Sequence, residues 1–112
     1  MKRRLPAFAF ALAAGASFAA LAGAQQAPFQ PDEIDQGREQ YHRTCAQCHG
    51  RNMVNSGTTV YDLRRFPVDD AERFQASVTQ GKGNMPSFKE ALTQEQVALL
   101  WAYVGSRGGK AP

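Results

Sequence analysis

Hydrophobic residues are arranged along this chain as one long apolar run followed by three stretches with helical periodicity. Residues 5–21 are nearly all Ala, Phe and Leu and carry no charge. Further on, apolar positions recur at intervals of three and four residues within 33–45, 70–79 and 93–105, which is the spacing of one face of an α-helix. The pattern therefore predicts an all-α domain that follows an apolar leader.

The starts of the three helices carry capping signals. Asp32 is placed to cap the first helix, and Asp69 or Asp70 is placed to cap the second. Thr93, with Gln96 three positions further on, has the pattern of a capping box for the third helix. Glycines follow the second and third helices, as is common at helix C-termini.

Gly37 stands inside the first predicted helix, where glycine costs about 1 kcal/mol relative to alanine. We therefore expect it to allow a close crossing with another helix. The same face carries Ile34, Tyr41 and Cys45. The apolar face of the last helix consists of Val97, Leu100, Trp101 and Val104, with Tyr103 beside it.

The segments outside the helices predict loops. Residues 50–67 contain only scattered apolar positions, and a short strand at Thr58–Tyr61 is an open alternative there. The final residues, 106–112, contain two glycines and a proline, and we expect them to fray.

The apolar run has the parts of a secretory signal peptide. Lys2, Arg3 and Arg4 precede it, and Ala22-Gly23-Ala24 follows it with the small residues that signal peptidase recognises. A transmembrane anchor is the alternative, but the run is short for a bilayer, which needs roughly 20 apolar residues. We expect cleavage after Ala24, giving a signal peptide at 1–24 and a single domain at 25–112 in the periplasm, with no membrane span in the mature chain.

Charge and size change once the leader is set aside. The whole chain has 13 Lys and Arg against 10 Asp and Glu, but three of those positive charges lie in residues 1–24 with no acid. The remaining 88 residues therefore have a net charge of zero, which gives no indication of nucleic-acid binding. A domain of this size usually needs a disulfide, a metal or a large cofactor to complete its core.

Both cysteines of the chain stand in the segment TCAQCHG, residues 44–50. A disulfide from Cys45 to Cys48 would close too small a loop to stabilise much, and the thioredoxin alternative lacks a βαβ pattern. A zinc site would need His42 to join Cys45, Cys48 and His49. The fourth interpretation fits best, because C-x-x-C-H is the signature of covalent haem attachment, with His49 as a ligand of the iron.

A haem iron in an electron carrier needs a sixth ligand, and the candidates are Met85, Met53 and His42. Met85 lies in GKGNMPSF, residues 81–88, where the glycines allow a turn and Pro86 favours an extended backbone before it. Met53 follows His49 too closely to reach the opposite face, and we expect it in the core. His42 is expected on a solvated helix face. Met85 is therefore the predicted ligand.

The order of these features resembles the class I monohaem cytochromes c: a helix, CAQCH, a loop, a helix, the glycine–Met-Pro loop and a capped C-terminal helix. The resemblance covers residues 32–105. It implies a small all-α fold of three to four helices around one haem c, with Gly37 and Tyr41 crossing Leu100 and Tyr103. The family often has a proline whose carbonyl orients the proximal histidine, but none stands between His49 and Pro67, so which carbonyl orients His49 is left open.

The resemblance implies a soluble, monomeric periplasmic electron carrier and not an enzyme. Its partners would be a periplasmic dehydrogenase as donor and a terminal oxidase or another cytochrome as acceptor. The segment from DLRRFP to GKGNMP also resembles cytochromes associated with quinoprotein alcohol dehydrogenases. Arg51, Lys82 and Lys89 could surround an exposed haem edge or be ordinary surface charges. The alternatives are a haem subunit of a larger oxidoreductase complex and an open-site haem enzyme or gas sensor.

Overall fold

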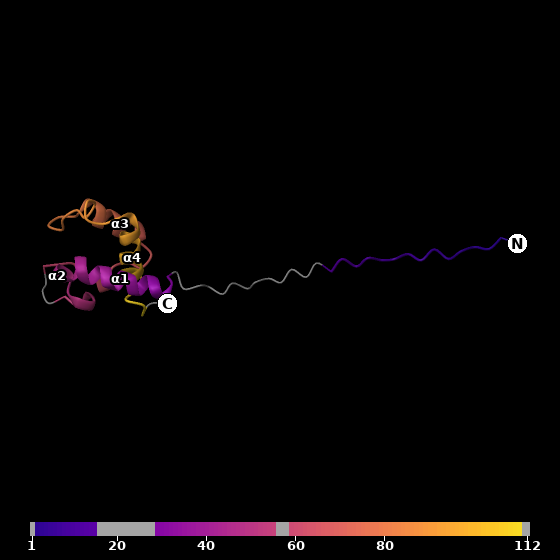
Figure 1. Ribbon diagram of the computed structural model, residues 1–112, viewed down its shortest axis with the longest axis horizontal. Helices are drawn as coiled ribbons and strands as arrows, with labels where there is room; N and C mark the ends of the chain where they lie inside the picture. The colour runs from indigo at the N-terminus through magenta and orange to yellow at the C-terminus, as the bar shows by residue number, and fades with distance from the viewer. Residues whose placement is uncertain (1, 16–28, 56–58, 111–112) are drawn as a thin grey trace.

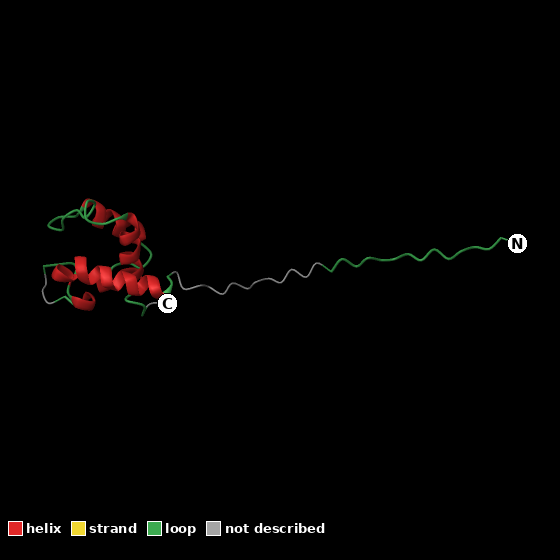
Figure 2. Ribbon diagram, viewed as in Figure 1, coloured by secondary structure: helices red, strands yellow, loops and turns green. Residues whose placement is uncertain are grey.

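The computed structural model describes residues 2–15, 29–55 and 59–110. Its elements are four α-helices and two short 3-10 helices: α1 (Pro31–Thr44), α2 (Ala46–His49), η1 (Arg51–Met53), η2 (Leu63–Arg65), α3 (Ala71–Gln80) and α4 (Gln94–Gly105). Figure 2 draws no strand in these residues, and the three residues described of the alternative strand, 59–61, lie in a loop. The prediction of an all-α domain is therefore confirmed.

Figure 1 shows α1 continuing into α2, while α3 and the loop after it extend to the same side of α4. The crossing of α1 and α4 depends on Gly37, as the sequence predicted. A Cβ atom at this position would clash with the carbonyl oxygen of Leu99 and stand 3.0 Å from the Cβ of Tyr103. Glycine thus lets the two helix backbones approach more closely than any larger residue would.

Side chains on both sides of the crossing are buried. Tyr41 and Leu100 have no exposed surface, and the rings of Tyr41 and Tyr103 have centroids 5.0 Å apart. A second cluster joins α3 to α4, where the rings of Phe66 and Phe74 lie 5.9 and 5.2 Å from Trp101. The core therefore lies along α4, between α1 on one side and α3 on the other.

Two of the three predicted caps are confirmed. Asp70 accepts a hydrogen bond from the Arg73 N–H at 3.2 Å, and Thr93 and Gln96 form the reciprocal capping box of α4. The assignment of Asp32 is wrong, because α1 begins earlier. Pro31 occupies the first helical position, where its missing N–H costs nothing, and the Glu33 carboxylate accepts a hydrogen bond from the Gln30 N–H.

The prediction of a frayed C-terminus is wrong for residues 106–110. Ser106 is buried, the Gly108 N–H donates to the Tyr103 carbonyl at 2.7 Å, and Arg38 donates to the Gly108 carbonyl at 3.2 Å. Positive φ angles at Gly108 and Gly109 turn this tail back onto α1. Residues 111–112 lie outside the described residues.

The leader is described only in part. Residues 2–15 form an extended, exposed segment ahead of the helices (Figure 1). The expected cleavage site at Ala22-Gly23-Ala24 lies outside the described residues. Within the part of the chain that the structure describes, no helix has both the length and the apolar character needed to cross a membrane.

Candidate functional site

The two cysteines lie three residues apart, within one helical turn, at the junction of α1 and α2. Cys45 is the residue between the helices, and its carbonyl accepts hydrogen bonds from the N–H groups of Cys48 at 3.2 Å and His49 at 2.9 Å. Both thiols are free; Cys45 is partly buried and Cys48 is exposed. Burial, followed by the proximity of Cys48, raises the pKa of the Cys45 thiol to about 12. At neutral pH this thiol is therefore protonated.

His49 is buried, and one of its ring nitrogens has a backbone partner. Nδ1 lies 3.0 Å from the carbonyl oxygen of Tyr61, and because a carbonyl only accepts, Nδ1 carries the proton. Nε2 has no hydrogen-bond partner among the described residues. The carbonyl that orients His49, left open by the absence of a proline after the motif, is therefore that of Tyr61. It holds the imidazole in the tautomer that leaves Nε2 free to bind a metal.

The segment that contains Tyr61 is tied down on both sides. The Asn55 side chain donates to the Val60 carbonyl at 2.8 Å. Asp62 caps η2 by accepting from the Arg64 N–H at 3.0 Å. The Arg64 side chain also bonds this carboxylate and holds the pKa of Asp62 below its usual range. These contacts fix the chain before and after the carbonyl that His49 uses.

Gly50 shapes the turn that follows His49. Its φ of 85° lies in the region that favours glycine, and a Cβ atom there would clash with the Val54 carbonyl. The Tyr41 hydroxyl donates to the Gly50 carbonyl at 2.7 Å and so fastens the turn to α1. Sequence reasoning missed Gly50 and Tyr61; the glycine directly after CAQCH was the one local signal available.

Met85 lies in a tight turn after α3. Lys82 and Met85 exchange two backbone hydrogen bonds of 3.0 Å across the turn at Gly83. Gly81 has a φ of 77°, and a Cβ atom there would stand 2.8 Å from the Met85 carbonyl oxygen. The Met85 side chain is half-buried against the core. The glycine-framed loop expected from the sequence is therefore present, and it holds Met85 by its backbone.

The structure brings Cys45, Cys48 and His49 together, whereas Met85 comes from a separate segment. Figure 1 shows α2 and the loop after α3 on the same side of α4. The other candidate methionine, Met53, is 4% exposed and lies in the core as expected.

The expectation that His42 lies on a solvated helix face is wrong. His42 is half-buried. Its Nδ1 donates to the Arg38 carbonyl at 2.8 Å, and its Nε2 accepts from the Asn52 N–H at 3.3 Å. The first bond fixes the imidazole on α1, and the second holds Asn52, in the segment after His49, against that helix. No group of three or more His, Cys, Asp or Glu side chains in the described ranges is arranged to hold a metal ion.

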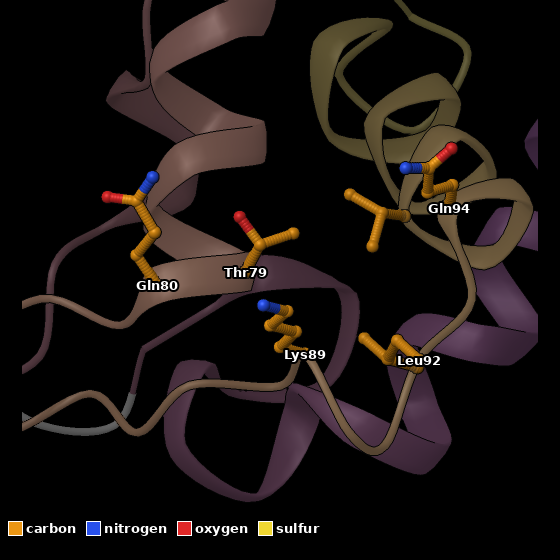
Figure 3. Close-up of a pocket in the computed structure, with 6 residues that line it drawn as sticks. Thr79, Gln80, Lys89, Leu92 and Gln94 are labelled. Atoms are coloured by element: carbon orange, nitrogen blue, oxygen red, sulfur yellow. The ribbon is translucent and has the colours of Figure 1, made fainter.

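Of the three cations that could surround a haem edge, Arg51 is exposed at the start of η1 and Lys82 is exposed in the turn after α3. Lys89, also exposed, lines a hollow of about 300 Å³ between the end of α3 and the start of α4 (Figure 3). The residues around this hollow are Thr79, Gln80, Lys89, Leu92, Gln94 and Val97. None of the predicted site residues takes part in it.

Comparison with known proteins gives consistent matches. The sequence profile of the family described as "Cytochrome C oxidase, cbb3-type, subunit III" matches residues 32–104. Cytochrome c6 of Gloeothece citriformis is 35% identical over 78 residues, which are 66% of this chain and 71% of that protein. Cytochrome c6 of a Nostoc species is 39% identical over 72 residues, covering 61% of this chain and 65% of the relative.

The chain is also similar to part of an enzyme and to a solved structure. Quinohemoprotein alcohol dehydrogenase ADH IIB of Pseudomonas putida is 36% identical over 80 residues, which are 69% of this chain but 11% of that enzyme. Among solved structures, cytochrome c6C from a Synechococcus species superposes with a TM-score of 0.52 at 27% identity, covering 70% of this chain and all of that one.

Proposed function

The chain belongs to the monohaem c-type cytochromes and is a cytochrome c6-like electron carrier, and from this premise we propose that Cys45 and Cys48 attach one haem c whose iron is bound by His49 and Met85. The single observation that carries the proposal is the His49 imidazole. It is buried, its Nδ1–H is held by the Tyr61 carbonyl at 3.0 Å, and it directly follows a free thiol. A metal-binding histidine typically has its second nitrogen held in this way.

The state of the cysteines fits the attachment chemistry. Each thiol would add across one vinyl group of the porphyrin, with sulfur bonding to one carbon and hydrogen to the other, so no oxidant is needed. Both thiols are free. Their positions on one helical turn before His49 would tie the porphyrin beside this imidazole.

The surroundings of the two proposed ligands favour a closed iron site. When bound, haem c would supply an iron that gains and loses one electron between its ferric and ferrous states. The Tyr61 carbonyl keeps His49 Nε2 available, and the Lys82–Met85 turn holds Met85 by backbone hydrogen bonds that need no partner protein. A neutral thioether disfavours the additional charge of ferric iron, which raises the reduction potential. The chain thus presents ligands suited to electron transfer rather than to binding of oxygen or peroxide.

Export and redox partners complete the proposal. Residues 1–24 are proposed to be a cleaved signal peptide, and residues 25–112 a monomeric periplasmic domain. The likeness to quinohemoprotein alcohol dehydrogenases supports a quinoprotein dehydrogenase as the electron donor. A terminal oxidase or another cytochrome would be the acceptor. The intact mass of protein from the periplasm, equal to residues 25–112 plus one haem, would establish cleavage and attachment together.

Replacement of Met85 tests the closed site. In ferric wild-type protein we expect the weak near-infrared band of sulfur-to-iron charge transfer, and Met85→Ala should lose it. The reduced variant should bind carbon monoxide readily and have a lower midpoint potential, because the ligand that favours ferrous iron is gone. Met53→Leu is the matched control, a swap of similar volume in the core that should keep the band.

Two results would contradict the assignment. Loss of the band in Met53→Leu but not in Met85→Ala would mean that the wrong methionine was chosen. Rapid stoichiometric binding of carbon monoxide by wild-type protein, with strong peroxide turnover, would indicate an open-site enzyme.

A second candidate function is a haem subunit of a larger oxidoreductase. It is favoured by the match of residues 32–104 to the cbb3-type oxidase subunit III family. The two candidates differ in hydrodynamics: a free carrier should sediment as a monomer in periplasmic extracts, whereas a subunit should sediment with the mass of its complex.

A further inference from the structure

Arg73 lies in the first turn of α3, facing the loop that supplies the carbonyl for His49. Its guanidinium carbon is 4.9 Å from the centre of the Phe66 ring and 5.9 Å from the centre of the Tyr61 ring. Both distances are within the range of a cation–π interaction. One side chain of α3 therefore contacts two aromatic residues of the segment 61–66.

Tyr61 has little other support for its side chain. Nearly half of its surface is exposed, and its hydroxyl reaches the Arg65 carbonyl only at 3.4 Å. Its ring meets the buried Phe66 edge-on at 6.1 Å. The residues on either side of Tyr61 are held by hydrogen bonds, Val60 by Asn55 and Asp62 by Arg64, and the packing of the Tyr61 ring adds a further constraint on the peptide between them.

The guanidinium of Arg73 has these two rings as its cation–π partners. Its backbone is anchored, since the Asp70 cap accepts from the Arg73 N–H. Neighbouring arginines have other partners: Arg64 bonds Asp62, and Arg107 donates to the Leu63 carbonyl. Among the described residues, the Arg73 guanidinium makes no ion pair or hydrogen bond, and its cation–π partners are the rings of Phe66 and Tyr61.

We propose that Arg73 is the positioning residue for His49. The guanidinium holds the Tyr61 ring against Phe66, the ring sets the Tyr61 carbonyl, and the carbonyl binds the His49 Nδ1–H at 3.0 Å. Such a partner of a ligand orients the ring and tunes the metal. This inference rests on the proposed binding of iron by His49.

Removal of Arg73 would have two effects of opposite sign on the reduction potential. Loss of its positive charge would favour ferric iron and lower the potential. A weaker Nδ1–H···O bond would make the imidazole a poorer electron donor and raise it. The rate at which the Nδ1 proton exchanges with water reports the hydrogen bond more directly, so it is the primary measurement.

The experiment uses haem-bearing Arg73→Leu, Arg73→Lys and Arg65→Leu proteins. Arg65 is the matched control, an exposed arginine of the same segment whose replacement removes the same charge. In the ferrous state, NMR should show the His49 Nδ1 proton of Arg73→Leu exchanging about 5- to 30-fold faster than in wild type, the factor expected on losing two exposed cation–π contacts. Arg73→Lys should be intermediate, since an ammonium keeps the charge but not the flat stacking. Arg65→Leu should exchange at the wild-type rate.

Midpoint potentials separate positioning from simple charge. If Arg73→Leu and Arg65→Leu lower the potential equally and neither changes the exchange rate, Arg73 acts only as a charge and the proposal is wrong. If Arg73→Leu does not accumulate, wild-type exchange in Arg73→Lys would be equally decisive against it. Absence of covalent haem from the wild-type protein would instead overturn the proposed function itself, and this inference with it.

Discussion

The α1–α4 crossing and the loops around His49 and Met85 are held in different ways. At the crossing, contact is made by buried side chains and by a glycine that removes a steric obstacle. Around His49 and Met85, the decisive contacts are to backbone carbonyls: those of Gly50, Tyr61, Lys82 and Met85. Packing therefore determines the scaffold, whereas the path of the backbone determines the site.

From this difference we predict that the packed α1–α4 crossing alone does not keep the domain folded when the haem is absent. The double variant Cys45→Ala/Cys48→Ala should lack covalent haem and be largely unfolded, because a domain of this size needs its cofactor to complete the core. Far-ultraviolet circular dichroism with a thermal scan is the measurement. Cys48→Ala alone, which keeps one attachment point, is the graded control.

The opposite result would contradict this comparison between the crossing and the loops. A colourless double variant with a sharp thermal transition would mean that the packed crossing is stable by itself. The loops would then be an addition to an independent scaffold, and the haem assignment would lose its structural argument.

Replacement of Gly37 tests the crossing itself and should have the next largest effect. In an open helix, alanine would be more stable than glycine by about 1 kcal/mol. Here the new Cβ would meet the Leu99 carbonyl, a backbone atom that cannot rotate away. We expect Gly37→Ala to lower the free energy of unfolding of the haem protein by about 1–3 kcal/mol, the usual cost of overpacking.

Urea unfolding of haem-bearing protein at neutral pH measures this change. Gln36→Ala, at the exposed position before Gly37 on α1, is the control and should stay within about 0.5 kcal/mol of wild type. If Gly37→Ala is more stable than wild type, helix propensity outweighs the close approach, and the crossing does not depend on its glycine.

The same difference explains which features could be predicted from the sequence. Gly37, the Asp70 cap and the Thr93–Gln96 box are local signals carried by side chains, and all three were correctly predicted. The Tyr61 carbonyl could not be predicted, because every residue has a carbonyl. Which one reaches His49 depends on the path of a loop across 12 residues.

The errors have a similar origin. The docked tail at 106–110 depends on Arg38 reaching a carbonyl 70 residues away, and His42 is held by the Asn52 N–H from the loop. Both are bonds between a side chain and a distant backbone group, for which residue type alone gives no signal. The assignment of His49 and Met85 as ligands stays a prediction from the motif, the glycine frame and the family.

The smallest predicted effect concerns a contact that joins the two regions, the hydrogen bond from the Tyr41 hydroxyl to the Gly50 carbonyl at 2.7 Å. Tyr41 belongs to the crossing, and Gly50 belongs to the turn after His49. Tyr41→Phe keeps the packing and removes one of the two donors of this carbonyl, leaving the Met53 N–H at 3.2 Å. Unfolding of the haem protein at pH 7 should therefore cost about 1 kcal/mol less. Tyr61→Phe is the control: it removes a longer bond at an exposed site and should change stability by less than about 0.5 kcal/mol.

The pH dependence of the same variant gives a sharper test. Burial, followed by the proximity of Cys45, raises the pKa of the Tyr41 hydroxyl above its ordinary value of 10.0. Because the folded pKa lies above the unfolded one, the contribution of the neutral hydroxyl is fully present below pH 10 and is lost as the pH rises further. Wild type should therefore lose stability above pH 10 more steeply than Tyr41→Phe, so that their difference at pH 7 shrinks at pH 11. Urea midpoints at the two pH values measure this, and parallel losses in both proteins would show that Tyr41 does not couple the crossing to the site through a buried, protonated hydroxyl.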